Sequence, residues 1–258
     1  MWFHDTFYRF RSVSDPTRLA SQLEAVCASA GLLGSVLIAS EGINGMLCGT
    51  ETGLQTVRDA LEVDERFAGM LYKRTACSDR VFKRLKIKVK LEIVPLGIDN
   101  VDASAPHERD RSPLEWRSLL GRDDVIVIDN RNSFEYELGH FRGAINPNVQ
   151  HFREFAAFMD AHLPEWEAQG KTVAMYCTGG IRCEKTTAWL AGRGHSVLQL
   201  EGGILNYFQQ LENADTDFDG ACFVFDARET LDTRLREVAL EGAAGAVSDP
   251  ARLFSNSR

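Results

Sequence analysis

Residues 172–185, TVAMYCTGGIRCEK, decide how the second half of the chain folds. The apolar run 172–176 has the length of a buried strand, the Gly179-Gly180 pair is typical of a tight loop, and a helical pattern follows. Alternation of strand and helix is typical of a parallel α/β sheet. Active groups in such sheets lie beyond the carboxyl ends of the strands, which is where this segment carries Cys177.

Cys177 is therefore the first candidate catalytic residue. The backbone amides that can point at its sulfur, as an anion-binding cradle, belong to Thr178, Gly179, Gly180 and Ile181. The helix that follows directs its positive end at the same place, and Arg182, the second candidate catalytic residue, adds a permanent charge. Such surroundings lower cysteine pKa values to about 3.5–7.5, so the sequence predicts a thiolate at neutral pH.

Cys183 lies six residues further on, at the start of the predicted helix. It has two interpretations: it resolves an oxidised Cys177, or it packs in the core. Buried cysteines commonly behave as small apolar side chains, and packing is the favoured interpretation.

Outward from this segment, short apolar runs alternate with helical patterns. Residues 125–129 and 196–200 are predicted strands beside 172–176, which completes a parallel α/β domain. The first half reads differently: strand 6–13, helix 15–30, strands 35–40 and 46–49, helix 52–63, and strands 70–76 and 85–94. This order, βαββαβ with one additional extended segment, predicts a ferredoxin-like α+β domain.

The segment EGING, residues 41–45, joins two of the predicted strands. Its Asn-Gly pair favours a tight hairpin turn, and the alternative is a surface loop that contacts substrate.

Four segments follow from these patterns. We predict a ferredoxin-like domain at residues 1–96, a polar linker at 97–112, the catalytic α/β domain at 113–228, and a loosely attached tail at 229–258 with a helical pattern near 230–240.

Composition and the absence of certain sequence signals limit the class of protein and its expected location. The chain has 258 residues, 44% hydrophobic and 26% charged, in the ordinary range of soluble proteins. It shows neither a secretory signal nor an apolar run of membrane-spanning length, which predicts a cytoplasmic protein with no membrane contact. No histidine and carboxylate set suits a metal, no cofactor fingerprint is evident, and nothing predicts a protein partner.

Positive charge is concentrated between residues 73 and 90, which hold eight Lys or Arg against one Asp in a chain of net charge −8. Alternation with apolar residues places several of these cations on one face of a strand. The candidate RNA-binding residues are Lys83, Arg84, Lys86, Lys88 and Lys90. Lysines that protect a solvated edge strand from aggregation are the alternative, and the residues alone do not separate the two.

Five segments of the second half resemble a rhodanese domain: DVIVIDNR (124–131), EY (135–136), GHFRGAIN (139–146), the Cys177 loop and LEGGI (200–204). The resemblance implies a persulfide on Cys177, whereas Asp129, Arg131 and the Gly139-His140 turn are assigned to the scaffold. Related phosphatases place five residues between cysteine and arginine. This chain has four, which favours sulfur chemistry over phosphate chemistry.

Three further segments resemble the bacterial oxygen-dependent tRNA uridine hydroxylases: ASEGING (39–45), FKRLKIKVK (82–90) and FDGACFVFD (218–226). That resemblance implies hydroxylation at C5 of uridine 34 of tRNA to give 5-hydroxyuridine, with the rhodanese cysteine required and molecular oxygen as co-substrate. Relatives carry a cysteine-rich tail suggestive of a metal site, but no cysteine follows Cys222 here, so no metal is expected.

Two alternatives remain open. A thiosulfate or persulfide sulfurtransferase needs only the second half of the chain, and a noncatalytic RNA-binding module needs only the first.

Overall fold

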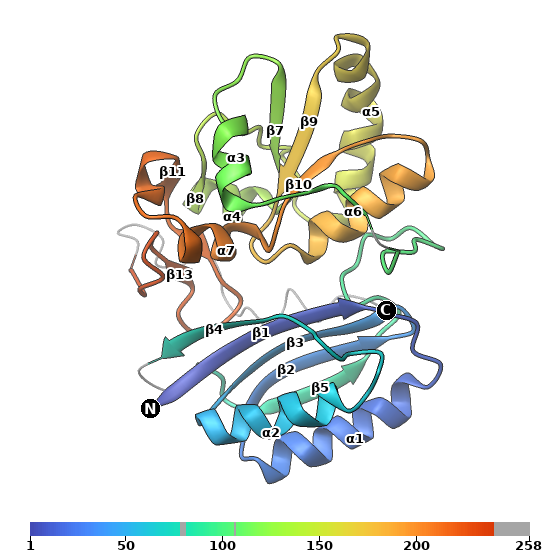
Figure 1. Cartoon of the computed structure of the whole chain (residues 1–258), viewed down its shortest axis with the longest axis vertical. Coiled ribbons are helices and arrows are strands. Elements are labelled where there is room, and N and C mark those ends of the chain that lie inside the picture. Colours follow the sequence, from blue (N-terminus) through green and yellow to red (C-terminus); the bar gives the residue numbers. More distant parts are fainter. Residues whose placement is uncertain (78–80, 106, 240–258) are drawn as a thin grey trace.

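The computed structural model describes residues 1–77, 81–105 and 107–239. Two sheets lie one above the other in Figure 1, and the first sheet carries its two helices on the face away from the second. The elements of the first domain are β1 (Trp2–Phe10), α1 (Pro16–Ser29), β2 (Leu33–Ala39), β3 (Gly42–Gly49), α2 (Glu51–Glu62), β4 (Tyr72–Cys77) and β5 (Leu85–Val89).

The first sheet has the strand order β4-β1-β3-β2-β5. Its first four strands and two helices form the predicted ferredoxin-like βαββαβ unit, and β5 is the additional strand, paired parallel to β2 at the sheet edge. The helices begin where capping residues stand: Asp15 accepts a hydrogen bond from the Arg18 amide before α1, and Thr50 accepts one from Gly53 before α2.

The predicted hairpin exists, but its turn lies elsewhere. β2 and β3 are paired as far as Ala39 opposite Gly42, so the turn is formed by Ser40 and Glu41, and the Asn-Gly pair lies inside β3. Gly45 is required there because a Cβ atom would lie 2.2 Å from the ring of Phe7. The Asn-Gly pair was therefore wrongly assigned to the turn: its glycine serves close packing, which sequence does not distinguish from turn geometry.

The second domain is built on the parallel sheet that the alternating pattern predicts, in the order β6-β10-β9-β7. Its sheet strands are β6 (Asp110–Arg111), β7 (Val125–Asp129), β9 (Thr172–Tyr176) and β10 (Leu198–Leu200). Its helices are α3 (Pro113–Leu119), α4 (Ser133–Leu138), α5 (Phe155–Ala168), α6 (Ile181–Gly192) and α7 (Gly203–Gln210), with 3-10 turns at 152–154 and 214–216. Its remaining short strands are β8 (Gly139–Phe141), β11 (Phe218–Gly220), β12 (Cys222–Phe223) and β13 (Thr230–Leu231).

Both ends of this domain differ from the sequence prediction. The predicted linker contributes β6, which pairs with β10, so its last residues belong to the sheet. The helix predicted near 230–240 is wrong for the described part: Thr230 and Leu231 are buried and form β13 against β12. Residues 229–239 therefore pack on the domain, and the rest of the predicted loose tail, 240–258, lies outside the described residues.

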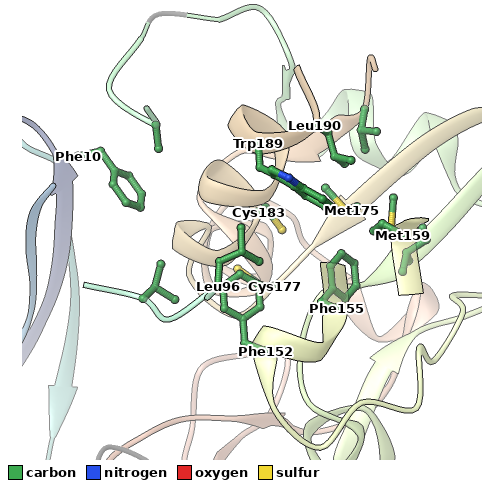
Figure 2. Close-up of a cluster of buried hydrophobic side chains, with 14 of the residues drawn as sticks. Phe10, Leu96, Phe152, Phe155, Met159, Met175, Cys177, Cys183, Trp189 and Leu190 are labelled. Atoms are coloured by element: carbon green, nitrogen blue, oxygen red, sulfur yellow. The ribbon is translucent and has the colours of Figure 1, made fainter. Parts of the chain in front are cut away.

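The two domains share a hydrophobic cluster (Figure 2). Phe10 of β1 faces it from the first sheet, and Leu96, Phe152, Trp189 and Cys177 lie in it. Apolar burial of this kind stabilises the contact between the domains by about 25 cal/mol per Å² removed from water.

A buried ammonium group also joins the domains. Lys185 of α6 is 1% exposed, and its Nζ lies 2.7 Å from Glu41 Oε2, 2.6 Å from Glu92 Oε2 and 3.1 Å from the Val94 carbonyl. Glu41, in the EGING segment, also accepts a hydrogen bond from the Ile93 amide. This residue thus holds the domains together, a role that neither sequence interpretation of the segment included.

Candidate active site

Cys177 directly follows the carboxyl end of β9, four residues before α6 begins. The Gly180 amide donates a hydrogen bond to its sulfur at 3.1 Å, and Gly180 adopts φ +100°, a conformation that favours glycine. The N-terminus of the twelve-residue helix α6 faces the same atom, so its partial positive charge adds to that of the amide.

The pKa of Cys177 reflects a balance of opposing effects. Burial opposes ionisation, but the hydrogen bond from the Cys183 thiol, the charge of Arg182 and the amides of Cys183 and Gly180 outweigh it. Together they lower the pKa of Cys177 to about 5, so the group is a thiolate at neutral pH.

Cys183 is fully buried beside Cys177 (Figure 2). Burial, and then its hydrogen bond to Cys177, raise the pKa of Cys183 well above its usual value. Cys183 is therefore a neutral thiol that donates to the Cys177 sulfur, a contact beyond the packing role that we favoured from sequence.

Arg182 is almost wholly buried, and its guanidinium group binds Glu135 in a fork, with N–O distances of 2.7 and 2.8 Å. Glu135 is fully buried in α4, and Arg182 also lies 3.4 Å from the Thr178 hydroxyl. The positive charge of Arg182 acts on Cys177 through space, while its hydrogen-bonding nitrogens hold the floor of the loop.

The LEGGI segment supports the other side of the loop. The amide of Ile204 donates to the Cys177 carbonyl at 3.0 Å, and that of Leu205 donates to the Thr178 carbonyl at 3.1 Å. A Cβ atom on Gly203 would lie 2.4 Å from the Cys177 carbonyl oxygen, so only glycine allows this approach.

The residues assigned to the scaffold occupy buried structural positions. Arg131 and Asp129 form a fully buried ion pair at 2.7 Å, and Arg131 also donates to the Gly139 carbonyl. The Tyr176 hydroxyl donates to Asp129 at 2.8 Å, which ties β9 to β7 just before the reactive loop.

Two residues of the first domain reach this loop, and sequence reasoning did not select them. Lys73 of β4 donates a hydrogen bond to the Gly179 carbonyl, and Tyr8 of β1 donates one to Glu184 of α6 at 2.7 Å. The only signal in the sequence was that Lys73 opens the basic stretch.

The candidate RNA-binding residues lie along β5 and directly before and after it, at the edge of the first sheet. Lys83, Arg84 and Lys88 are exposed, and Lys86 and Lys90 are partly exposed. Leu85 and Ile87 pack toward α1, so Lys86 and Lys88 point to the opposite face of the sheet.

Within residues 1–77, 81–105 and 107–239, no group of three or more His, Cys, Asp or Glu side chains is placed to hold a metal ion. No helix in the same ranges is both long enough and apolar enough to cross a membrane.

Family models match both domains. Residues 4–93 match the model described as UPF0176 acylphosphatase like domain, and residues 112–210 match the Rhodanese-like domain. These descriptions agree with the ferredoxin-like and rhodanese-like assignments made from the sequence.

Curated relatives match almost the whole chain. A protein of Legionella pneumophila (strain Corby) is 38% identical over 90% of this chain and 91% of its own length. One of Deinococcus radiodurans is 41% identical over 89% and 76%, and one of Acinetobacter baumannii (strain AYE) is 40% identical over 92% and 75%. Each of the three carries the name tRNA uridine(34) hydroxylase.

Proposed function

Because this chain belongs to the tRNA uridine(34) hydroxylase family, we propose that it hydroxylates the wobble uridine of tRNA to 5-hydroxyuridine and that Cys177 is its reactive residue. The observation that carries the proposal is a thiolate at the end of β9, held by the Gly180 amide and the Cys183 thiol, in a chain similar to these enzymes over both domains. Molecular oxygen is the proposed co-substrate.

The chain's own residues have definite roles in this proposal. The cysteine loop stabilises the sulfur anion, because amide and thiol donors and the positive charge of Arg182 compensate its burial. A thiolate of this kind is a nucleophile at neutral pH and is able to carry a sulfane sulfur as a persulfide.

The face of the first sheet that meets the loop supports tRNA as the partner. Cross-strand pairing forms one row across all five strands: Lys73, Thr6, Met46, Ser35 and Lys86. Paired residues share a face, so the β5 lysines lie on the same face as Lys73, about 19 Å away across four strand spacings. An RNA bound at β5 would therefore lie on the same face of the sheet from which Lys73 contacts the cysteine loop.

We expect a strain lacking this protein to lose 5-hydroxyuridine and its derivatives from tRNA and to regain them when the wild-type chain is supplied. Nucleoside mass spectrometry measures the change. Growth under ¹⁸O₂ tests the co-substrate, because the C5 hydroxyl then carries the heavy isotope. The proposed function is contradicted if the deletion strain has as much 5-hydroxyuridine as the wild type, and as much of it labelled with ¹⁸O after growth under ¹⁸O₂.

A sulfurtransferase is the second candidate, favoured by the four-residue loop between Cys177 and Arg182. Thiocyanate formed from thiosulfate and cyanide by the purified protein, with normal 5-hydroxyuridine in the deletion strain, supports that candidate instead.

The β5 surface makes a separate prediction. Lys86→Gln and Lys88→Gln are each expected to weaken tRNA binding. Each is also expected to reduce the magnitude of the slope of log affinity against log salt by about 0.7–0.9, because a protein with one phosphate contact fewer releases fewer counterions on binding. Binding of purified protein to tRNA over a salt series measures the slope. Lys171→Gln is the matched control, because Lys171 is a partly exposed lysine that bonds only a backbone carbonyl in the second domain. Equal slopes for all variants support the edge-protection interpretation of the lysines.

A further inference from the structure

One peptide group in the cysteine loop makes contacts at both of its ends. Its N–H belongs to Gly180 and donates to the Cys177 sulfur at 3.1 Å, while its carbonyl belongs to Gly179 and accepts a hydrogen bond from Lys73. The sulfur and the ammonium group therefore lie at opposite ends of a single peptide dipole, and the ammonium group comes from the other domain.

The local backbone alone does not fix this orientation of the peptide. It joins two glycines, and Gly180 has φ +100°, so no Cβ atom on either side restricts the rotation of the peptide. An ammonium group bound to the carbonyl fixes the orientation. It also polarises the peptide, which strengthens the N–H as a donor to sulfur.

Tyr8 covers the same peptide from the first sheet. A Cβ atom on Gly180 would lie 2.9 Å from the Tyr8 hydroxyl, and that hydroxyl donates to Glu184 at 2.7 Å. The Lys73 ammonium lies 5.7 Å from the centre of the Tyr8 ring, within the range of a cation–π contact. Lys73 and Tyr8 thus hold each other in place above the loop.

The charges in this contact agree with such an arrangement. Burial lowers the pKa of Lys73 to about 8, against the opposing influence of the negative Cys177, Glu184 and Glu201, so the group is mostly protonated at neutral pH. Burial raises the pKa of Glu184 to about 7, against the hydrogen bond from Tyr8. The charged and titratable groups that act on the loop and on the two side chains covering it are Tyr8 (β1), Lys73 (β4), Asp110 (β6), Glu135 (α4), Arg182, Cys183 and Glu184 (α6), and Glu201 just before α7.

We propose that Lys73 is a positioning residue for Cys177. It holds and polarises the Gly179–Gly180 peptide, so the docked N-terminal domain helps to stabilise the reactive thiolate of the second domain. The inference deepens the proposed function, since it rests on Cys177 as the reactive group, but it does not depend on which substrate the thiolate serves.

The test is a titration of thiolate ultraviolet absorbance between pH 3 and 8, with the matching Cys177→Ser protein subtracted at every pH. Lys73→Met is expected to raise the midpoint from about 5 by about one unit, which is a tenfold change in the ionisation constant. Lys73→Arg supplies another cationic donor to the carbonyl and is expected to return the midpoint most of the way.

Lys171→Met is the matched control, because Lys171 also donates to one backbone carbonyl, that of Asp123, beside the opposite end of β9. Its midpoint is expected to stay at the wild-type value. If circular dichroism shows that Lys73→Met is unfolded, the midpoint of Lys73→Gln is measured instead, because glutamine keeps a hydrogen-bond donor but removes the charge. A wild-type midpoint in the folded Lys73→Met or Lys73→Gln protein overturns the proposal.

This titration and the nucleoside measurement fail independently. A shifted midpoint with unchanged tRNA in the deletion strain leaves Lys73 as a positioning residue and removes the hydroxylase function. An unshifted midpoint with loss of 5-hydroxyuridine in the deletion strain removes the role of Lys73 and leaves the hydroxylase function.

Discussion

Cys177→Ser is expected to restore no 5-hydroxyuridine to the tRNA of a strain that lacks this protein. The serine hydroxyl fits the loop and can still accept the Gly180 hydrogen bond, so the fold is expected to persist. It does not ionise at neutral pH, however, whereas the pKa of Cys177 is lowered to about 5. The change therefore removes the anion while leaving the shape of the site.

Nucleoside mass spectrometry of complemented strains measures this effect, with protein levels checked by immunoblot. Cys27→Ala is the matched control, because Cys27 is buried in α1, where burial raises its pKa to about 12 and keeps it a neutral thiol. Full restoration is expected for that control. A serine variant that restores the modification rules out the thiolate as the reactive group.

The same thiolate predicts the pH dependence of the purified enzyme. Activity that requires the Cys177 anion is expected to decline as the pH falls through about 5 and to show no further gain from this group above neutrality.

Lys185→Met is the second large effect, on stability. The methionine fills most of the volume but leaves Glu41 and Glu92 facing each other without the ammonium group that lies 2.7 and 2.6 Å from them. Removing one member of a buried ion pair typically costs about 3–5 kcal/mol, because a charge is left unpaired. Both carboxylates are partly exposed, so we expect about 3 kcal/mol, or a fall in Tm of roughly 6–12 °C.

Thermal and urea unfolding of the full chain measure this loss. The triple variant Glu41→Gln, Glu92→Gln, Lys185→Met is expected to recover much of it, since no stranded charge remains. Lys171→Met, a change of the same kind at an exposed bond, is expected to stay within about 0.5 kcal/mol of wild type. A loss below about 1 kcal/mol for Lys185→Met means that the ammonium group does not hold the domains together.

Local patterns carried much of the prediction. The strand, the glycine loop and the start of the helix around Cys177 lie within fourteen residues, so their order alone predicts the position of the sulfur and why it ionises. The alternation of strands and helices similarly predicts both domain folds. In each case the informative pattern lies within a short stretch of sequence.

What the sequence did not reveal depends on contacts between distant segments. Lys73 meets Gly179 across 106 positions and Tyr8 meets Glu184 across 176, and no spacing rule connects them. Gly45 serves packing against Phe7 and not a turn, and Asp110 joins a sheet edge although its neighbours are polar. Residue type alone was ambiguous at each of these positions until the partner was known.

The N-terminal part of α6 carries both Glu184, bound to Tyr8, and Lys185, bound to Glu41 and Glu92. A hinge motion that parted the domains would have to break these bonds together with the one from Lys73. The bonds lie on either side of the catalytic loop, so the two halves of the molecule are expected to move as one rigid body.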